Sequence, residues 1–160
     1  MAESRSAFQV RVRKEAGARK REVRKERDAE VRAITSDWKE GFANLKEEND
    51  RLQLEANEIY RESILEDDAW LREQLAAGPP AGEPKTIWKE EVMRNYARAT
   101  RDNRTGREHL IEECTKKWKE GFRALKAEND RRQKAVGLFM KEQTAEVDAW
   151  LKEQLATGPP

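Results

Sequence analysis

The chain has 160 residues, with 33 Lys and Arg against 32 Asp and Glu, a formal net charge of +1, and charged residues at 41% of the sequence. Leu, Ile, Val and Phe number 27 of the 160 residues, about 17%, which is below the roughly 20% that a sizeable core requires. A single Cys (Cys114) excludes an intramolecular disulfide, and no apolar run approaches the roughly 18 residues of a bilayer span. We therefore expect a soluble, intracellular chain with a thin core and no membrane partner.

The first segment of the chain is basic. Residues 1–34 contain 11 Lys and Arg against 6 Asp and Glu, whereas residues 35–80 contain 5 against 12. The basic run in residues 11–27 could contact a polyanion such as nucleic acid, or it could be a solvated helix with ion pairs such as Glu15 with Arg19. We favour the solvated helix, because residues 81–116, with 8 Lys and Arg against 7 Asp and Glu, do not repeat the basic excess.

An internal repeat with an offset of 80 residues organises the sequence. Residues 37–80 and 117–160 share 25 identical residues in 44 columns, and both copies end in Gly-Pro-Pro. All five prolines lie at the boundaries of the two 80-residue repeats. The sequence therefore predicts two domains, a helical repeat over 1–80 and a second over 81–160, joined by a Gly/Pro linker at about 78–85.

Each repeat is predicted to be mainly one long helix, which makes the fold class all-α. More than 70 residues rich in Glu, Lys, Arg, Ala, Leu and Gln pass without a proline. Apolar residues recur at steps of four and three with a polar residue, Asn49 or Asn129, in the stripe, as in a coiled coil. The segment 102–106 is the predicted weak point of the second helix. A hairpin and an extended arrangement of the two helices both remain open.

The sequence lacks the motifs that carry enzyme chemistry, although carboxylates are abundant. The single histidine, His109, and the nearby Glu112, Glu113 and Cys114 do not match a metal-ligand spacing. Gly-rich phosphate loops and a nucleophile elbow are also missing from the sequence. We therefore expect no catalytic residues, no metal and no cofactor.

A duplicated aromatic and basic motif is the strongest candidate for a partner-binding site. Steps of four and seven place its Trp, Phe and Leu on one helix face, with its two lysines on an adjoining stripe. Such a face suits docking on a protein partner, with aromatic anchors and lysines that select an acidic surface. The alternative is that the aromatics form the seam between the two helices. The candidate residues are Trp38, Lys39, Phe42, Leu45 and Lys46 in the first copy, and Trp118, Lys119, Phe122, Leu125 and Lys126 in the second.

Each copy also has a glycine in mid-helix, Gly41 or Gly121. A glycine there costs about 1 kcal/mol relative to alanine. This cost is understandable if another group must approach the helix closely at that point.

The motif resembles the Rubisco-binding helix of the repeat-containing linker proteins that condense Rubisco in the pyrenoids of green algae. The resemblance covers about nine residues per repeat, and a partial third copy comprises Trp88, Lys89, Val92 and Tyr96. It implies that Rubisco is the protein partner, that docking uses apolar and salt-bridge contacts, and that the chain is located in a chloroplast pyrenoid. Two sites on one chain would then bridge separate targets and favour condensation.

Three functions follow from these observations. The first is a non-enzymatic, multivalent helical adaptor or scaffold that bridges a partner protein, with Rubisco as the named case. The alternative is a structural coiled-coil repeat protein of a cytoskeletal or filament array, in which self-association buries the aromatic stripe. A weaker alternative is nucleic-acid binding through residues 11–27.

Overall fold

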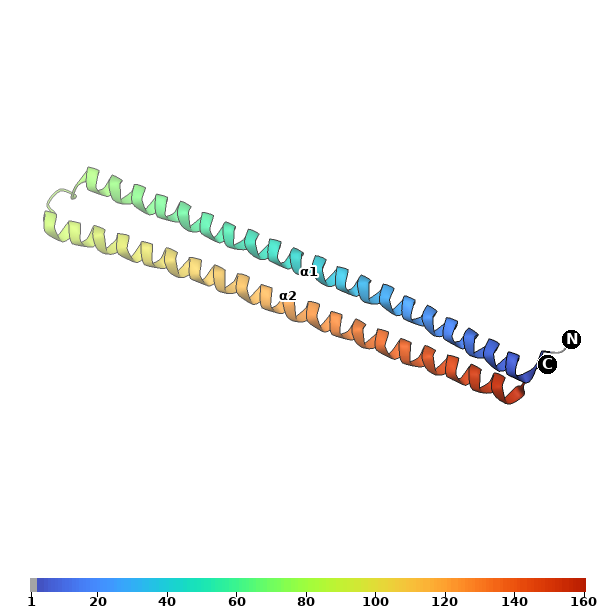
Figure 1. Ribbon diagram of the computed structural model, residues 1–160. Coiled ribbons are helices and arrows are strands. Elements are labelled where there is room, and N and C mark those ends of the chain that lie inside the picture. Colours follow the sequence, from blue (N-terminus) through green and yellow to red (C-terminus); the bar gives the residue numbers. More distant parts are fainter. Residues whose placement is uncertain (1–2) are drawn as a thin grey trace. The chain divides into compact units, whose positions relative to one another are not determined.

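The computed structural model describes residues 3–160, so the first two residues of predicted repeat 1 lie outside the described part. It contains two helices, α1 (Arg5–Ala77) and α2 (Lys85–Thr157), each of 73 residues. No strand occurs within residues 3–160 (Figure 1). The predicted all-α fold with one long helix per repeat is therefore confirmed.

The ends of α1 are fixed by local hydrogen bonds. Ser4 is the N-cap, because its side-chain Oγ accepts a hydrogen bond of 3.1 Å from the Ala7 amide. At the other end, Gly78 adopts a φ of +72° and its N–H donates to the Gln74 carbonyl at 3.1 Å. Glycine adopts this left-handed conformation without the strain that a Cβ atom would cause, so α1 stops there.

A short loop of residues 78–84 joins the helices. Gly82 has a φ of +84°, and the Glu83 N–H donates to the Pro80 carbonyl at 3.1 Å. Pro84 directly precedes α2, and its carbonyl accepts the Trp88 N–H at 3.1 Å. Proline suits this position because its fixed φ is helical and its missing N–H is not needed there.

Residue contacts divide the chain into two compact units. Unit 1 combines the described residues up to Phe42 with Arg123–Pro160, and unit 2 is Ala43–Phe122. Each unit therefore contains one segment of α1 and one of α2, taken from different predicted repeats. Unit 2 also contains the loop that joins the helices, at the green and yellow end of the ribbon in Figure 1.

The two helical segments are antiparallel within each unit. In unit 1, Lys20 contacts Asp148 and Arg27 contacts Met140. The residue numbers of the contacting residues thus fall along α2 as they rise along α1. In unit 2, Asn57 pairs with Arg107 and Asp68 with Tyr96. Of the two arrangements that the sequence left open, the helices of each unit adopt hairpin-like packing.

Each unit has a thin core along the seam between its helices. Spacings of about four residues along α1 place apolar side chains on the face toward α2. The buried residues of unit 1 are Phe8, Val12, Ala16, Val23, Ile34 and Val147, and those of unit 2 are Ala56, Trp88, Val92 and Cys114. No polar or charged residue within 3–160 is buried.

The helix α2 continues through residues 102–106, the segment predicted to be its weak point. Two residues of this region bond across the seam. Asn103 donates to Asp67, and Arg107 donates to Asn57 Oδ1 at 3.0 Å. The local sequence alone does not reveal these contacts with α1.

Within the described residues, neither α1 nor α2 has a stretch of the length and apolar character needed to pass through a membrane.

Candidate functional site

The first candidate contact lies in unit 1, where Leu125 of the second motif copy packs against Gly41 of the first. A Cβ atom at Gly41 would lie 2.6 Å from Leu125 Cδ1 and 3.3 Å from its Cδ2. A larger residue at Gly41 would therefore force the leucine side chain to move. Gly41 and Leu125 are both half-buried.

Unit 2 contains the same contact with the roles of the copies exchanged. Leu45 of the first copy packs against Gly121 of the second, and a Cβ atom at Gly121 would lie 2.5 Å from Leu45 Cδ2. Each leucine thus occupies the space that the missing glycine side chain of the other copy leaves open. The close approach indicated by these mid-helix glycines is present in both units.

The aromatic residues of the motif lie beside this seam. Trp38, Trp118 and Phe122 are half-buried, whereas Phe42 is 38% exposed. In unit 2, the Trp118 and Phe122 rings stack with centroids 6.4 Å apart and an interplanar angle of 26°. The predicted docking face is therefore partly used inside the protein.

The four lysines of the motif have a different environment. Lys39, Lys46, Lys119 and Lys126 are all exposed, and none forms an ion pair in the described part of the chain. The motif therefore directs its leucine toward the neighbouring helix and its two positive charges toward solvent.

The partial third copy belongs mainly to the core of unit 2. Trp88 and Val92 are 7% and 5% exposed, while Lys89 is exposed. Tyr96 donates a hydrogen bond of 2.6 Å to Asp68 Oδ1. This hydrogen bond, together with desolvation and the negative charge of Asp68, raises the pKa of the Tyr96 phenol.

Polar residues interrupt the seam at the positions that the sequence indicated. Asn49 is half-buried, and its Oδ1 is buried without a hydrogen-bond partner among the described residues. Arg132, which replaces Leu52 of the first copy, donates to Asp37 Oδ2 within unit 1. This hydrogen bond raises the pKa of the Arg132 guanidinium. The seam is therefore apolar only in part.

Two further contacts in unit 1 were not found from the sequence. The Arg19 guanidinium lies 3.9 Å from the centroid of the Trp150 ring, and Lys20 Nζ lies 2.6 Å from Asp148 Oδ1. An i,i+4 pattern correctly indicates the bond from Arg19 to Glu15 at 3.0 Å. It cannot reveal contacts with α2, because these depend on the register between the helices.

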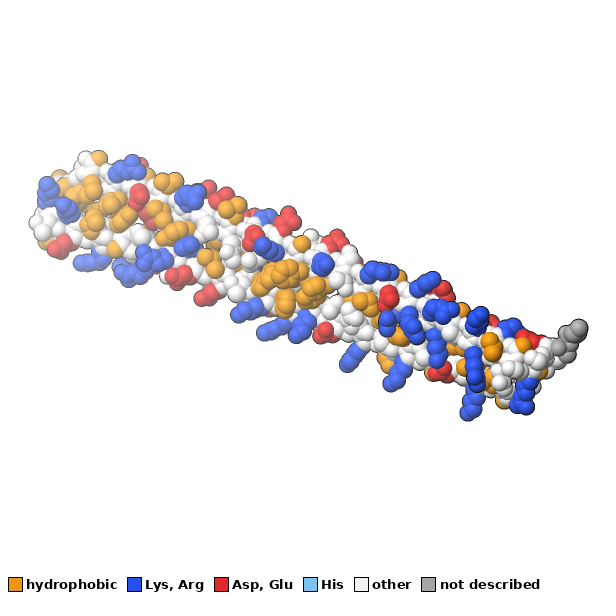
Figure 2. Space-filling model, viewed as in Figure 1, with side chains coloured by type: hydrophobic (Ala, Val, Ile, Leu, Met, Phe, Trp, Pro, Cys, Tyr) orange, Lys and Arg blue, Asp and Glu red, His pale blue; other side chains and the backbone are white. Residues whose placement is uncertain are grey.

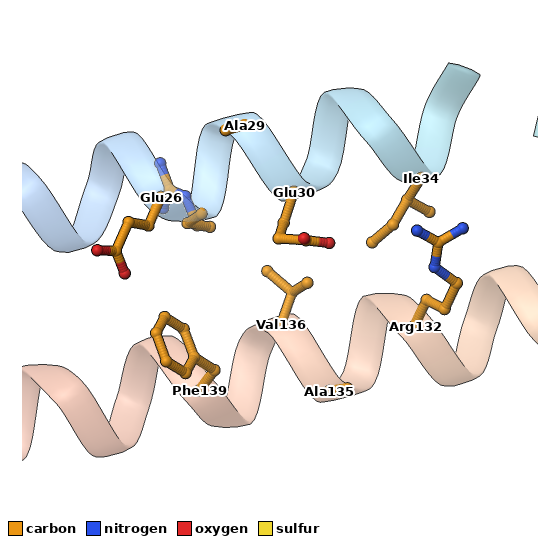
Figure 3. Close-up of a pocket in the computed structure, with 9 residues that line it drawn as sticks. Glu26, Ala29, Glu30, Ile34, Arg132, Ala135, Val136 and Phe139 are labelled. Atoms are coloured by element: carbon orange, nitrogen blue, oxygen red, sulfur yellow. The ribbon is translucent and has the colours of Figure 1, made fainter. Parts of the chain in front are cut away.

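An open apolar groove of about 630 Å³ lies between the two helical segments of unit 1 (Figure 3). Val136 and Phe139 of α2 point toward α1, and Glu30 and Ile34 of α1 face them. The remaining lining residues are Glu26, Arg27, Ala29, Arg132 and Ala135. The small alanine side chains leave this space unfilled.

The described residues contain no group of three or more His, Cys, Asp or Glu side chains placed to hold a metal ion. His109 lies 3.4 Å from Glu113 on an exposed surface, and Cys114 is buried in the core of unit 2. The features that the site provides are therefore contacts between helices and exposed charged side chains.

Comparison with known proteins finds no matching family model, no matching curated protein and no matching solved structure.

Proposed function

We propose that the protein is a non-enzymatic structural element, a helical hairpin in which the duplicated motif holds the two helices together. The observation that carries this proposal is the pair of glycine–leucine contacts, one in each unit. A leucine side chain that fills a glycine gap is removed from water and makes many dispersion contacts. Because each copy supplies both a glycine and a leucine, duplication of one motif generates both contacts.

The exposed lysines favour a second function for the same motif, the adaptor that the resemblance to Rubisco linkers implies. Phe42 is 38% exposed and both lysines of each copy are exposed, which leaves part of the predicted docking face available to a partner. Docking on Rubisco stays a prediction, as does a location in a pyrenoid.

Two matched sets of variants separate these functions. The structural set combines Leu45→Ala with Leu125→Ala, and the docking set reverses the lysines with Lys39→Glu, Lys46→Glu, Lys119→Glu and Lys126→Glu. Each set is measured by thermal unfolding followed by circular dichroism, and by turbidity on mixing with purified algal Rubisco at low and high salt.

The structural proposal predicts a clear fall in Tm for the leucine set and little change for the lysine set. Truncation of a buried leucine typically costs about 2–5 kcal/mol, and the lower end applies here because both leucines are only half-buried. An unchanged Tm in the leucine set would refute the structural proposal. Salt-sensitive turbidity that only the lysine set abolishes would establish the adaptor.

A further inference from the structure

The outer surface of α1 carries two long rows in which one sign of charge predominates, one row in each unit; Asp28 interrupts the first and Arg51 the second. The first, which we name the basic stripe, lies in unit 1 and consists of Lys14, Arg21, Lys25, Arg32 and Lys39. The second, the acidic stripe, lies in unit 2 and consists of Glu48, Glu55, Glu62, Glu66 and Glu73. Steps of four and seven residues return to the same side of an α-helix, so each set shares one face.

All ten side chains belong to exposed residues. Lys25 is bonded to Glu22 of its own helix at 3.3 Å, and Arg51 is bonded to both Glu48 and Glu55 at 2.7 Å. The other seven residues of the stripes form no ion pair within residues 3–160. Most of the charge on both stripes is therefore available to a partner.

The spacing of the two stripes is the same when one of them is read backwards. From Lys14 to Lys39 the steps are seven, four, seven and seven residues, and from Glu73 back to Glu48 the steps are identical. An antiparallel alignment places a basic residue opposite a glutamate at every position. A parallel alignment matches only four of the five.

Both stripes belong to the same helix, α1 (Arg5–Ala77). The units also differ in net charge. Unit 1 has 19 Lys and Arg against 14 Asp and Glu, a net charge of +5, whereas unit 2 has 14 against 18, a net charge of −4. Lys and Arg side chains are numerous on the visible face of unit 1 in Figure 2. Charge complementarity thus favours contact between unlike units of different chains.

We propose that the basic stripe of one copy of the chain binds the acidic stripe of a second copy, with the two α1 segments antiparallel. This inference rests on the proposed structural role, because it names the partner that the hairpin binds. The five opposed pairs are Lys14 with Glu73, Arg21 with Glu66, Lys25 with Glu62, Arg32 with Glu55, and Lys39 with Glu48.

The equivalent positions of α2 do not provide a second basic stripe. Thr105 and Glu112 stand where α1 has Lys25 and Arg32. On the acidic side, α2 keeps four glutamates but has Ala135 where α1 has Glu55. The complete match is therefore a property of α1 alone.

Charge reversal in two complementary variants tests the proposal by analytical ultracentrifugation of the full chain. One variant changes all five basic-stripe residues to Glu, and the other changes all five acidic-stripe residues to Lys. Wild type should self-associate at low salt and dissociate as salt screens the charges. Each variant alone should associate about tenfold or more weakly than wild type, because like charges then face each other. A mixture of the two variants should associate again.

The matched control changes five exposed arginines and lysines of α2 to Glu: Arg94, Arg98, Arg101, Arg104 and Lys116. It alters the net charge as much as reversal of the basic stripe does, but it should leave self-association intact. Circular dichroism of every variant verifies that the helices remain folded. Self-association is thus read separately from the Tm that tests the structural role.

Zero-length carbodiimide cross-linking tests the orientation, since it joins lysine amines to carboxylates in direct contact. A mixture of isotopically labelled and unlabelled chains should give intermolecular links from Lys14 to Glu73 and from Lys25 to Glu62. Links from Lys14 to Glu48 and from Lys39 to Glu73, which a parallel alignment would give, would overturn the antiparallel pairing. A wild-type chain that stays monomeric at low salt would overturn the whole proposal, and binding of polyuridylate by such a monomer would assign the basic stripe to nucleic acid.

Discussion

Unit 1 and unit 2 contain the same glycine–leucine contact but differ in the charge and polarity around it. In unit 1, the polar contacts across the seam use cations, such as Lys20 with Asp148 and Arg132 with Asp37. In unit 2, α1 supplies Asp67 and Asp68, which accept hydrogen bonds from the neutral side chains of Asn103 and Tyr96, and the one cation among these contacts, Arg107, donates to the neutral Asn57. One duplicated motif can therefore sit in two different electrostatic environments.

The difference in charge arises both in the diverged segments and in the similar copies of the repeat. Residues 1–36, in unit 1, have 11 Lys and Arg against 6 Asp and Glu, whereas the equivalent residues 81–116, in unit 2, have 8 against 7. Residues 43–80 of unit 2 have 4 Lys and Arg against 10 Asp and Glu, whereas the equivalent residues 123–160 of unit 1 have 7 against 6. The shared motif thus supplies the same contact between the helices in both units, while substitutions throughout the repeat set the charge of each unit.

Among single substitutions, Trp88→Ala in unit 2 should cause the largest loss in the free energy of unfolding. Trp88 is 7% exposed, and truncation of a buried tryptophan typically costs about 3–5 kcal/mol. Its neighbour Ile87 is 58% exposed, so Ile87→Ala is the matched control and should cost about 0.5 kcal/mol or less. Urea unfolding followed by circular dichroism gives both values. If Trp88→Ala and Ile87→Ala reduced the free energy of unfolding equally, Trp88 would not belong to the core.

The glycines provide a matched comparison inside each unit. Apart from the adjoining residues and the helix's own backbone, no atom lies within 4 Å of a Cβ placed at Gly137 in unit 1 or Gly106 in unit 2. Alanine at either position should therefore stabilise the protein by about 1 kcal/mol through helix propensity. Gly41→Ala and Gly121→Ala should be less stable than these controls by about 1–3 kcal/mol, because Leu125 and Leu45 must move. Thermal unfolding that ranks all four alanine variants equally would contradict the close contact.

A smaller loss of stability should come from Tyr96→Phe in unit 2, which removes the hydrogen bond to Asp68. The folded state raises the pKa of the Tyr96 phenol above its ordinary value of 10.0. The stabilisation is therefore complete below pH 10 and is lost as the pH rises through the higher folded-state pKa. We expect the Tm difference between wild type and Tyr96→Phe to shrink at high pH. A difference that stays constant with pH would rule out this hydrogen bond as its source.

The smallest loss of stability should come from Arg19→Ala in unit 1. The guanidinium lies 3.9 Å from the Trp150 ring centroid, and an exposed cation–π contact contributes about 0.5–1 kcal/mol. Arg13 is exposed and has no ion pair or cation–π contact in residues 3–160, so Arg13→Ala is the control. Chemical unfolding should show a loss for Arg19→Ala alone. A tryptophan emission spectrum that does not change in Arg19→Ala would count against the contact.

Composition and periodicity determined the helices of this protein. More than 70 residues of strong helix formers without proline, followed by Gly78 and Pro79, predicted one long helix per repeat, and the structure agrees. Helix formation depends on local hydrogen bonds and local propensity, which the sequence displays directly. The glycines at positions 41 and 121 also indicated a close approach before any neighbour was known.

The tertiary structure decided which groups approach those glycines and how the motif is divided between seam and solvent. Leu125 lies 84 residues beyond Gly41 in the sequence, and nothing local to either residue identifies the other as its partner. Asn103 and Arg107 of α2 likewise donate hydrogen bonds to Asp67 and Asn57 of α1, and no local pattern identifies these partners. Contacts of this kind follow from the register between two helices, which is set by packing along the whole seam and not by the propensity of any one segment.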